Sequence, residues 1–247
     1  MKKIFLITLF FFFNFKISLA DKIDILEDIK GDGIKVINHS WVKIEYTGTF
    51  ENGKIFDTNV GKDNPLVFQI GMKEVIPGFE QGILGTFKGT KRKIKIPSKL
   101  AYGEKGAGDL IPPNSNLIFN FEVLDVLEPN YKKIGNDELV KLIKQNAVAL
   151  DIRLENQWKK TGIIKGSFQE TAFDINGKFN VYLMDKVRAL AGAASQNVEI
   201  IFISYDGKTA EILANAFAED LGFKNVYVLD GGINSWIDAK KDLVDYN

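Results

Sequence analysis

The sequence predicts an α+β domain, in which an antiparallel sheet wraps on one short helix, followed by an α/β domain with a mainly parallel sheet. From residue 21 to residue 128, short runs of alternating apolar residues are separated by glycine turns, and one short helical pattern stands among them. From residue 131 to residue 247, strand-like and helical stretches alternate, as is typical of a parallel sheet. The sequence Glu-Pro-Asn at 128–130 breaks the last strand of the first region, so we expect domains at 21–128 and 131–247.

The first twenty residues follow a different pattern. Lys2 and Lys3 precede an uninterrupted apolar run at 4–13, and a small-residue ending follows at 18–20. This is the layout of a secretory signal peptide over residues 1–20, with cleavage expected after its last residue. The run is too short to span a membrane, which takes about 20 apolar residues. We therefore expect a secreted or periplasmic protein, attached to a membrane only if the signal stays uncleaved.

The composition excludes several kinds of chemistry. The chain has no cysteine and a single histidine, His39. This excludes disulfides, thiolate metal sites and cysteine nucleophiles, and it removes the commonest general base, so we expect no metal and no cofactor. His39 lies between a turn and a strand, where a surface or structural role is expected. Without Lys2, Lys3 and Lys16, 29 basic residues stand against 32 acidic ones, a net charge of −3 that gives no support for nucleic-acid binding.

The short helix is predicted within residues 71–85. Val75, Ile76 and Phe79 recur at three- and four-residue spacing, which indicates one apolar helix face. Pro77 suits the first turn, where its missing N–H would have no partner. A helix of one or two turns is not stable alone, so it must lie against apolar strands. Two roles are open for its apolar face: ordinary core packing, or the floor of a hydrophobic pocket.

Three motifs in the first domain resemble FKBP-type peptidyl-prolyl cis-trans isomerases. In family order they are VKIEYTGTFENGKIFDT, EVIPGFEQGILGTFKGTKRKIKIPSKLAYG and LIPPNSNLIFNFEVLDV. Independently of these motifs, the apolar alternation and the turn residues predict a turn and strand at 31–36, a half-buried strand at 40–50 and a hairpin turn at Asn52-Gly53. The resemblance covers residues 24–128 and implies a fold and a function: an isomerase that acts on proline-containing unfolded or partly folded polypeptides and binds macrolide inhibitors.

The resemblance also implies the residues of the site. The hydroxyl of Tyr102 and the backbone N–H of Ile76 would donate to substrate carbonyls, and Asp57 would bond Tyr46 or the substrate at the rim. The catalytic candidates are Tyr46, Asp57 and Tyr102, and the substrate-binding candidates are Phe56, Phe68, Val75, Ile76, Phe79, Ile111 and Phe119. Each aromatic residue alone could equally be core packing, and Phe68 and Phe119 could be mainly structural.

The chemistry suits a chain without conventional nucleophiles. Isomerisation breaks no covalent bond, and its barrier of ~18–20 kcal/mol comes from amide resonance. An apolar pocket disfavours the charge-separated planar amide relative to the twisted one, so no acid–base pair is needed. Three departures from the family pattern predict a slightly deeper pocket, weaker activity and weaker macrolide affinity: Phe79 replaces tryptophan, Leu66 replaces phenylalanine and Ala107 replaces a larger ring.

The second domain resembles the rhodanese-like family. The matching motifs are ALDIR at 149–153, GIIKGS at 162–167 and GFKNVYVLDGGINSW at 222–236. Active members of that family carry a sulfur-bearing cysteine where this chain has Ser204, so sulfurtransferase activity is not expected. The loop at 204–209 could still bind an anion through backbone N–H groups at a helix N-terminus. A helix is predicted at 136–145 with Asn136 as its cap.

In the second domain, Asp151 and Arg153 are expected to pair and brace the end of a strand rather than to catalyse a reaction.

Taken together, the sequence predicts an exported prolyl isomerase whose degenerate rhodanese-like domain serves for binding. The competing hypothesis is a non-catalytic chaperone that uses both domains as binding surfaces. Turnover of a short Xaa-Pro peptide distinguishes the two.

Overall fold

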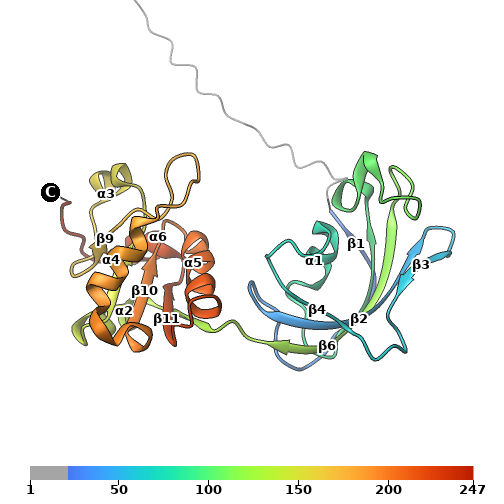
Figure 1. Cartoon of the computed structure of the whole chain (residues 1–247), viewed down its shortest axis with the longest axis horizontal. Helices are drawn as coiled ribbons and strands as arrows, with labels where there is room; N and C mark the ends of the chain where they lie inside the picture. The colour runs from blue at the N-terminus through green and yellow to red at the C-terminus, as the bar shows by residue number, and fades with distance from the viewer. Residues whose placement is uncertain (1–21, 247) are drawn as a thin grey trace, which may run out of the picture. The chain divides into compact units, whose positions relative to one another are not determined.

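The computed structural model describes residues 22–246. The chain divides into two compact units, and the boundary along the sequence falls between Glu128 and Pro129 (Figure 1). The predicted signal peptide lies outside the described residues. Within the described part of the chain, no helix has the length and apolar character needed to cross a membrane. The two units are α+β and α/β, as predicted, and each is described separately below.

The first unit is an antiparallel sheet around one helix. Its sheet order is β1-β5-β6-β2-β3, and β4 pairs with β2 off this path. The helix α1 (Pro77–Ile83) lies in the hollow of the curved sheet (Figure 1). The strands are β1 (Asp24–Ile29), β2 (Trp41–Phe50), β3 (Ile55–Thr58), β4 (Leu66–Gln69), β5 (Lys91–Ile96) and β6 (Leu117–Leu127), and short 3-10 turns span Ser98–Leu100 and Gly103–Lys105.

Two glycines let α1 approach the sheet closely. A Cβ atom on Gly78 would lie 2.3 Å from Ile96 Cγ2, and one on Gly82 would lie 2.4 Å from Ile94 Cδ1. These glycines stand four residues apart and therefore share one helix face, which contacts β5. Pro77 occupies the first turn as predicted. The two glycines lie against the strand, and the side chain of Phe79, on the same helix, is buried in the core.

The structure differs from the sequence prediction at the start of this unit. The first predicted strand, at 31–36, is present only as a single antiparallel bridge between Lys35 and Phe87. The actual first strand is β1, which pairs with β5 and is exposed along its whole length. No buried side chain therefore anchors β1 in the core. Backbone pairing with β5 holds it, together with two charged pairs: Arg92 with Asp28, and Lys93 with Glu27.

The second unit is a parallel sheet with helices on both faces (Figure 1). Its strand order is β7-β11-β10-β8-β9, and every neighbouring pair is parallel. The strands are β7 (Tyr131–Ile134), β8 (Val148–Asp151), β9 (Phe168–Gln169), β10 (Glu199–Ile203) and β11 (Asn225–Leu229). The helices are α2 (Asn136–Lys144), α3 (Glu155–Thr161), α4 (Tyr182–Ala191), α5 (Lys208–Glu219) and α6 (Gly232–Asp238), with a 3-10 turn at Gly192–Asn197.

The central strand β10 divides this unit into two cores. Ile200 and Phe202 pack on one face with α4 and α5, whereas Ile201 and Ile203 pack on the other face with α2 and α6. The alternation follows from the two-residue period of a strand. Because both faces are buried, β10 is a continuous apolar run instead of an alternating one.

One predicted cap is wrong. Gly135, not Asn136, is the N-cap residue of α2, and no side chain caps that end. The side chain of Asn136 instead donates to the backbone oxygen of Ser235 at 3.0 Å. The amide therefore ties the start of α2 to α6, and an Asn that looks like a cap in sequence serves a tertiary contact.

Candidate active site

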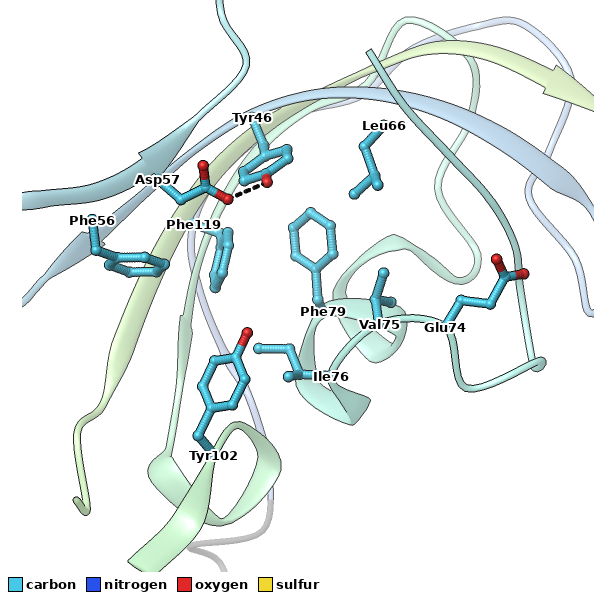
Figure 2. A pocket seen from close by; sticks show the side chains of 10 residues that line it. All are labelled: Tyr46, Phe56, Asp57, Leu66, Glu74, Val75, Ile76, Phe79, Tyr102 and Phe119. Carbon is cyan, nitrogen blue, oxygen red and sulfur yellow. Dashed lines mark hydrogen bonds between the residues drawn. The ribbon is translucent and has the colours of Figure 1, made fainter. Parts of the chain in front are cut away.

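A cavity of about 390 Å³ opens on the concave side of the first sheet (Figure 2). Residues from β2, β3, β4, β6, α1 and the two loops around 74–76 and 102 converge on it. It is lined by Tyr46, Phe56, Asp57, Leu66, Glu74, Val75, Ile76, Phe79, Tyr102 and Phe119. Most of these side chains are apolar, so a bound group would leave water for a hydrocarbon surface.

Phe79 is the centre of the aromatic cluster. Its ring is 2% exposed and lies 4.7 Å from the ring of Phe119 and 5.8 Å, edge-on, from that of Tyr46, measured between centroids. Phe68 lies behind it at 6.4 Å. Edge-on and tilted aromatic pairs at these distances are stabilising beyond the area that they bury. The cluster therefore fixes the wall of the cavity with little room for rotation.

Tyr46 and Asp57 form the polar rim. The hydroxyl of Tyr46 donates to Asp57 Oδ2 at 2.5 Å, and Figure 2 shows this bond at the edge of the cavity. Burial, and then the neighbouring Asp57 carboxylate, raise the pKa of Tyr46 well above its ordinary value, so the hydroxyl keeps its proton. The strand is held in place by Asn59, whose Oδ1 accepts from the N–H of Tyr46 at 2.6 Å and whose Nδ2 donates to Ile44 O at 3.0 Å. The sequence analysis missed this positioning role of Asn59.

Two donors at the cavity have no acceptor within residues 22–246. One is the hydroxyl of Tyr102, which points toward the cavity in Figure 2. The other is the backbone N–H of Ile76, the N-cap residue of α1, whose extended conformation begins the helix. Unpaired donors at the mouth of an apolar cavity are suited to a ligand carbonyl.

Eight of the ten predicted site residues line this cavity. Phe68 and Ile111 do not: both are buried in the core of the first unit, 1% and 4% exposed. Ile111 belongs to the loop at 103–113, where its backbone pairs with Ala107. Glu74 lines the cavity but was not among the predicted site residues. Its position directly before Val75 in the pocket motif is the signal that could have identified it.

The loop after β10, where Ser204 stands, is closed by its own hydrogen bonds. Ser204 is 3% exposed, and its Oγ accepts from the N–H of Gly207 at 3.1 Å and from that of Ala210 at 3.2 Å. Asp206 Oδ1 accepts from the N–H of Lys208 at 3.1 Å, and its carboxylate pairs with the Lys208 ammonium. These amides are therefore already used, which weighs against the predicted anion site.

Asp151 and Arg153 form a buried, two-pronged ion pair. Arg153 Nε and Nη2 donate to the two carboxylate oxygens of Asp151 at 2.8 and 2.6 Å, and both side chains are at most 1% exposed. The guanidinium also donates to Thr161 Oγ1 and to the backbone oxygen of Gly162. The pair links the end of β8 to the end of α3, in keeping with the structural role expected of it.

Among residues 22–246, no group of three or more histidine, cysteine, aspartate or glutamate side chains is placed to hold a metal ion.

Two family models match the chain. The model for FKBP-type peptidyl-prolyl cis-trans isomerase matches residues 33–124, and the model for the rhodanese-like domain matches residues 135–239. The first match contains the cavity around Phe79, and the second contains the Ser204 loop.

Several individual proteins are similar to part of the chain. The chain is 41% identical over 105 residues to an FK506-binding protein of Neisseria meningitidis, a match that covers 42% of this chain and 96% of that protein. It is 47% identical over 93 residues to FK506-binding protein 2 of Dictyostelium discoideum, covering 38% of this chain and 70% of the relative. The match to FK506-binding protein 2 of Yarrowia lipolytica, at 49% identity, covers 34% of this chain and 59% of that protein.

Among solved structures, FkpA from Escherichia coli is similar to the chain at 39% sequence identity. The match covers 42% of this chain and 46% of that chain, with a TM-score of 0.37.

Proposed function

Because the chain belongs to the FKBP family of peptidyl-prolyl cis-trans isomerases, we propose that the cavity around Phe79 is the site at which it isomerises Xaa-Pro bonds. The chain is an isomerase of the FKBP type, with a rhodanese-like domain after it. It has no cysteine and is not a sulfurtransferase. Proteins of this family bind proline-containing substrates and macrolides in general.

The cavity lowers the barrier by changing the surroundings of the imide bond. The planar imide is stabilised by resonance, which places partial charges on its nitrogen and oxygen, and rotation removes that resonance at a cost of ~18–20 kcal/mol. Water solvates the charge-separated planar form well. The rings of Tyr46, Phe79 and Phe119 replace that water with an apolar surface, which disfavours the planar form relative to the twisted one.

Hydrogen-bond donors then hold the twisted substrate. The Tyr102 hydroxyl and the Ile76 N–H are assigned to the carbonyl oxygens on either side of the rotating bond. Asp57 holds the hydroxyl of Tyr46 and so fixes the ring that forms the rim. The observation that carries the assignment is the coincidence of two unpaired donors with an apolar cavity of about 390 Å³.

The test is the isomerisation rate of an Xaa-Pro tetrapeptide with residues 21–247 and with the Tyr102→Phe, Asp57→Ala double variant. We expect catalysis in the parent chain, inhibition by a macrolide of the FK506 type, and a large loss in the folded double variant. Equal rates in both proteins would remove Tyr102 and Asp57 from the site. Matched circular dichroism spectra would show that the loss does not come from unfolding.

Export and client capture complete the proposal. The charged, then apolar, then small-residue layout of residues 1–20 supports export. With the Ser204 loop closed by its own hydrogen bonds, the rhodanese-like unit is assigned to binding of polypeptide clients. Export is tested by N-terminal sequencing of the protein recovered from outside the cytoplasm: a mature chain that begins at Asp21 supports it, and an intact Met1 there contradicts cleavage.

A further inference from the structure

We propose that the rhodanese-like unit carries a second ligand site, for a small apolar carboxylate, between α2, α6 and the segment before β9. A cavity of about 430 Å³ lies there. Its apolar lining comes from Val140 and Ile143 of α2, from Ile164, and from Trp236 of α6. This volume is within the range of about 300–1,000 Å³ that is usual for small-molecule sites.

Two lysines give the cavity its charge. Lys144 and Lys165 both line it, both are exposed, and neither has an ion-pair partner within residues 22–246. The nearby Lys241, which lies over the ring of Trp236, is in contrast paired with Asp137 at 2.7 Å. An apolar surface with two unpaired ammonium groups is complementary to a ligand with a hydrocarbon body and one anionic head.

The residues that line this cavity also favour a small carboxylate over a peptide as its ligand. A peptide strand brings backbone N–H groups that need acceptors when they leave water. None of the side chains that line the cavity carries a hydrogen-bond acceptor, because they belong to valine, isoleucine, lysine and tryptophan. A fatty-acid-like ligand has no such N–H groups and leaves none unpaired. The observations therefore favour a small carboxylate over a polypeptide.

This site is separate from the Ser204 loop. Lys144 directly precedes the segment that leads into β8, and Lys165 precedes β9, whereas Ser204 follows β10. Because β8, β9 and β10 are parallel, residues before the strands lie at one edge of the sheet and residues after them at the opposite edge. The loss of sulfur chemistry in the loop therefore leaves the second cavity unaffected.

The test is calorimetric titration of residues 21–247 with dodecanoate and with dodecanol. We expect dodecanoate to bind more tightly, because only its carboxylate meets the lysines. The Lys144→Glu, Lys165→Glu double variant should weaken dodecanoate binding about tenfold and leave dodecanol binding unchanged. The matched control is Lys178→Glu, Lys224→Glu, which reverses two exposed lysines of the same unit that do not line the cavity.

A variant that fills the cavity with a larger side chain tests whether the probes bind there. Val140→Trp should abolish binding of both probes and keep the isomerase rate, since the catalytic cavity is in the other unit. The proposal is overturned if the charge-reversed variant and its control bind dodecanoate equally, or if Val140→Trp leaves binding intact. It is also overturned if an acidic, apolar peptide binds with this variant dependence while dodecanoate does not. Matched thermal melts show that each variant is folded.

Discussion

At Ser204, a single hydroxyl occupies the centre of a loop that holds a reactive sulfur atom in sulfur-transferring relatives. Its Oγ accepts two backbone N–H groups that would otherwise be buried without a partner. The Ser204 hydroxyl therefore closes the loop with hydrogen bonds from within the chain. It serves as the acceptor for two N–H groups at the start of α5, whose N-cap residue is Gly207.

We expect Ser204→Ala to destabilise the second unit by about 1–3 kcal/mol, because the N–H groups of Gly207 and Ala210 lose their acceptor. Urea unfolding of the variant and its parent measures the difference. The matched control is Thr209→Ala, which removes a hydroxyl from the same loop that makes no hydrogen bond within the described residues. Equal losses in the two variants would contradict this role of the Ser204 hydroxyl. Isomerase activity should be unchanged in both.

In the active site, Asp57→Ala should lower kcat/KM by about tenfold, the equivalent of losing one charge-assisted hydrogen bond of about 1.5 kcal/mol. The physical reason is that Tyr46 loses the acceptor that fixes its hydroxyl. Asp57→Asn keeps an oxygen acceptor at the same position and should retain most of the rate. A tetrapeptide isomerisation assay measures both variants. If Asn is as poor as Ala, the charge itself, and not the hold on Tyr46, is what the reaction needs.

The single change Tyr102→Phe isolates the proposed donor. It removes one neutral hydrogen bond of about 1 kcal/mol, so we expect about a fivefold loss in kcat/KM with the fold intact. Full activity in Tyr102→Phe would exclude the hydroxyl as a donor to substrate. Tyr205→Phe, an exposed tyrosine of the second unit, is the matched control and should show no loss.

At the scale of an element, β2 brings a glycine against the aromatic wall. A Cβ atom on Gly48 would lie 2.5 Å from Phe56 Cζ and 3.1 Å from Phe119 Cε1. We expect Gly48→Ala to displace the ring of Phe56 and to lower kcat/KM while the sheet stays folded. Thr49→Ala is the control, since neighbouring residues of a strand point to opposite faces. A crystal structure of Gly48→Ala with an unmoved Phe56 ring would contradict this expectation.

The edge strand β1 provides a pH-dependent prediction. The two-pronged Arg92 contact holds the pKa of Asp28 below its ordinary value of 3.8. A lowered folded-state pKa contributes stability above the unfolded-state pKa, and this stability disappears as the pH falls through the folded-state value. Asp28→Asn should therefore cost about 0.5–1 kcal/mol at neutral pH, a modest value for a partly exposed pair. The cost should vanish well below pH 3.8 in urea titrations, whereas a pH-independent cost would mean that packing is responsible.

A comparison of α1 with β1 shows which elements can be predicted from the sequence. The helix predicted within 71–85 is confirmed as α1, because proline, glycine and apolar spacing are all local signals. The strand β1 was missed because its six residues are all exposed, so no buried face produced an apolar pattern. Its place depends on backbone pairing and ion pairs with β5, about 65 residues away, and such pairing has no local signature.

In the candidate site too, some features could be predicted from the sequence and others depend on tertiary packing. Eight predicted residues lie around one cavity, since the three motifs that carry them include both the strands and the helix. The structure adds what residue type and spacing in the sequence do not contain. Phe68 and Ile111 are buried in the core and do not line the cavity, and Asn59 holds the strand of Tyr46 by two backbone contacts. Side-chain direction and backbone contacts depend on tertiary packing, which one sequence does not reveal.

At the scale of the whole molecule, each unit has a core of its own. Each buried cluster consists of residues from only one unit: one cluster in residues 36–126, and two in residues 131–236, on either side of the parallel sheet. We expect urea to unfold the chain in two transitions, so that a single two-state free energy does not describe it. Circular dichroism combined with isomerase activity would separate the two.

Residues 22–128 alone should then keep the kcat/KM of the full chain on a tetrapeptide. On a protein client, the full chain should be faster if the second unit captures clients as proposed. Equal rates on the protein client would remove that role and leave isomerisation intact. A fragment 22–128 that does not fold would contradict the independence of the first core.

The phenylalanine in the centre of the aromatic wall has a spectroscopic consequence. With Phe79 in this place, none of the three indoles of the chain lines the cavity around it, because Trp41 lies in β2, Trp158 in α3 and Trp236 in α6. Ligands that enter the cavity are therefore expected to leave the near-ultraviolet emission of the protein almost unchanged. Two of the three tryptophans belong to the second unit, so the emission spectrum mainly reports on the rhodanese-like unit.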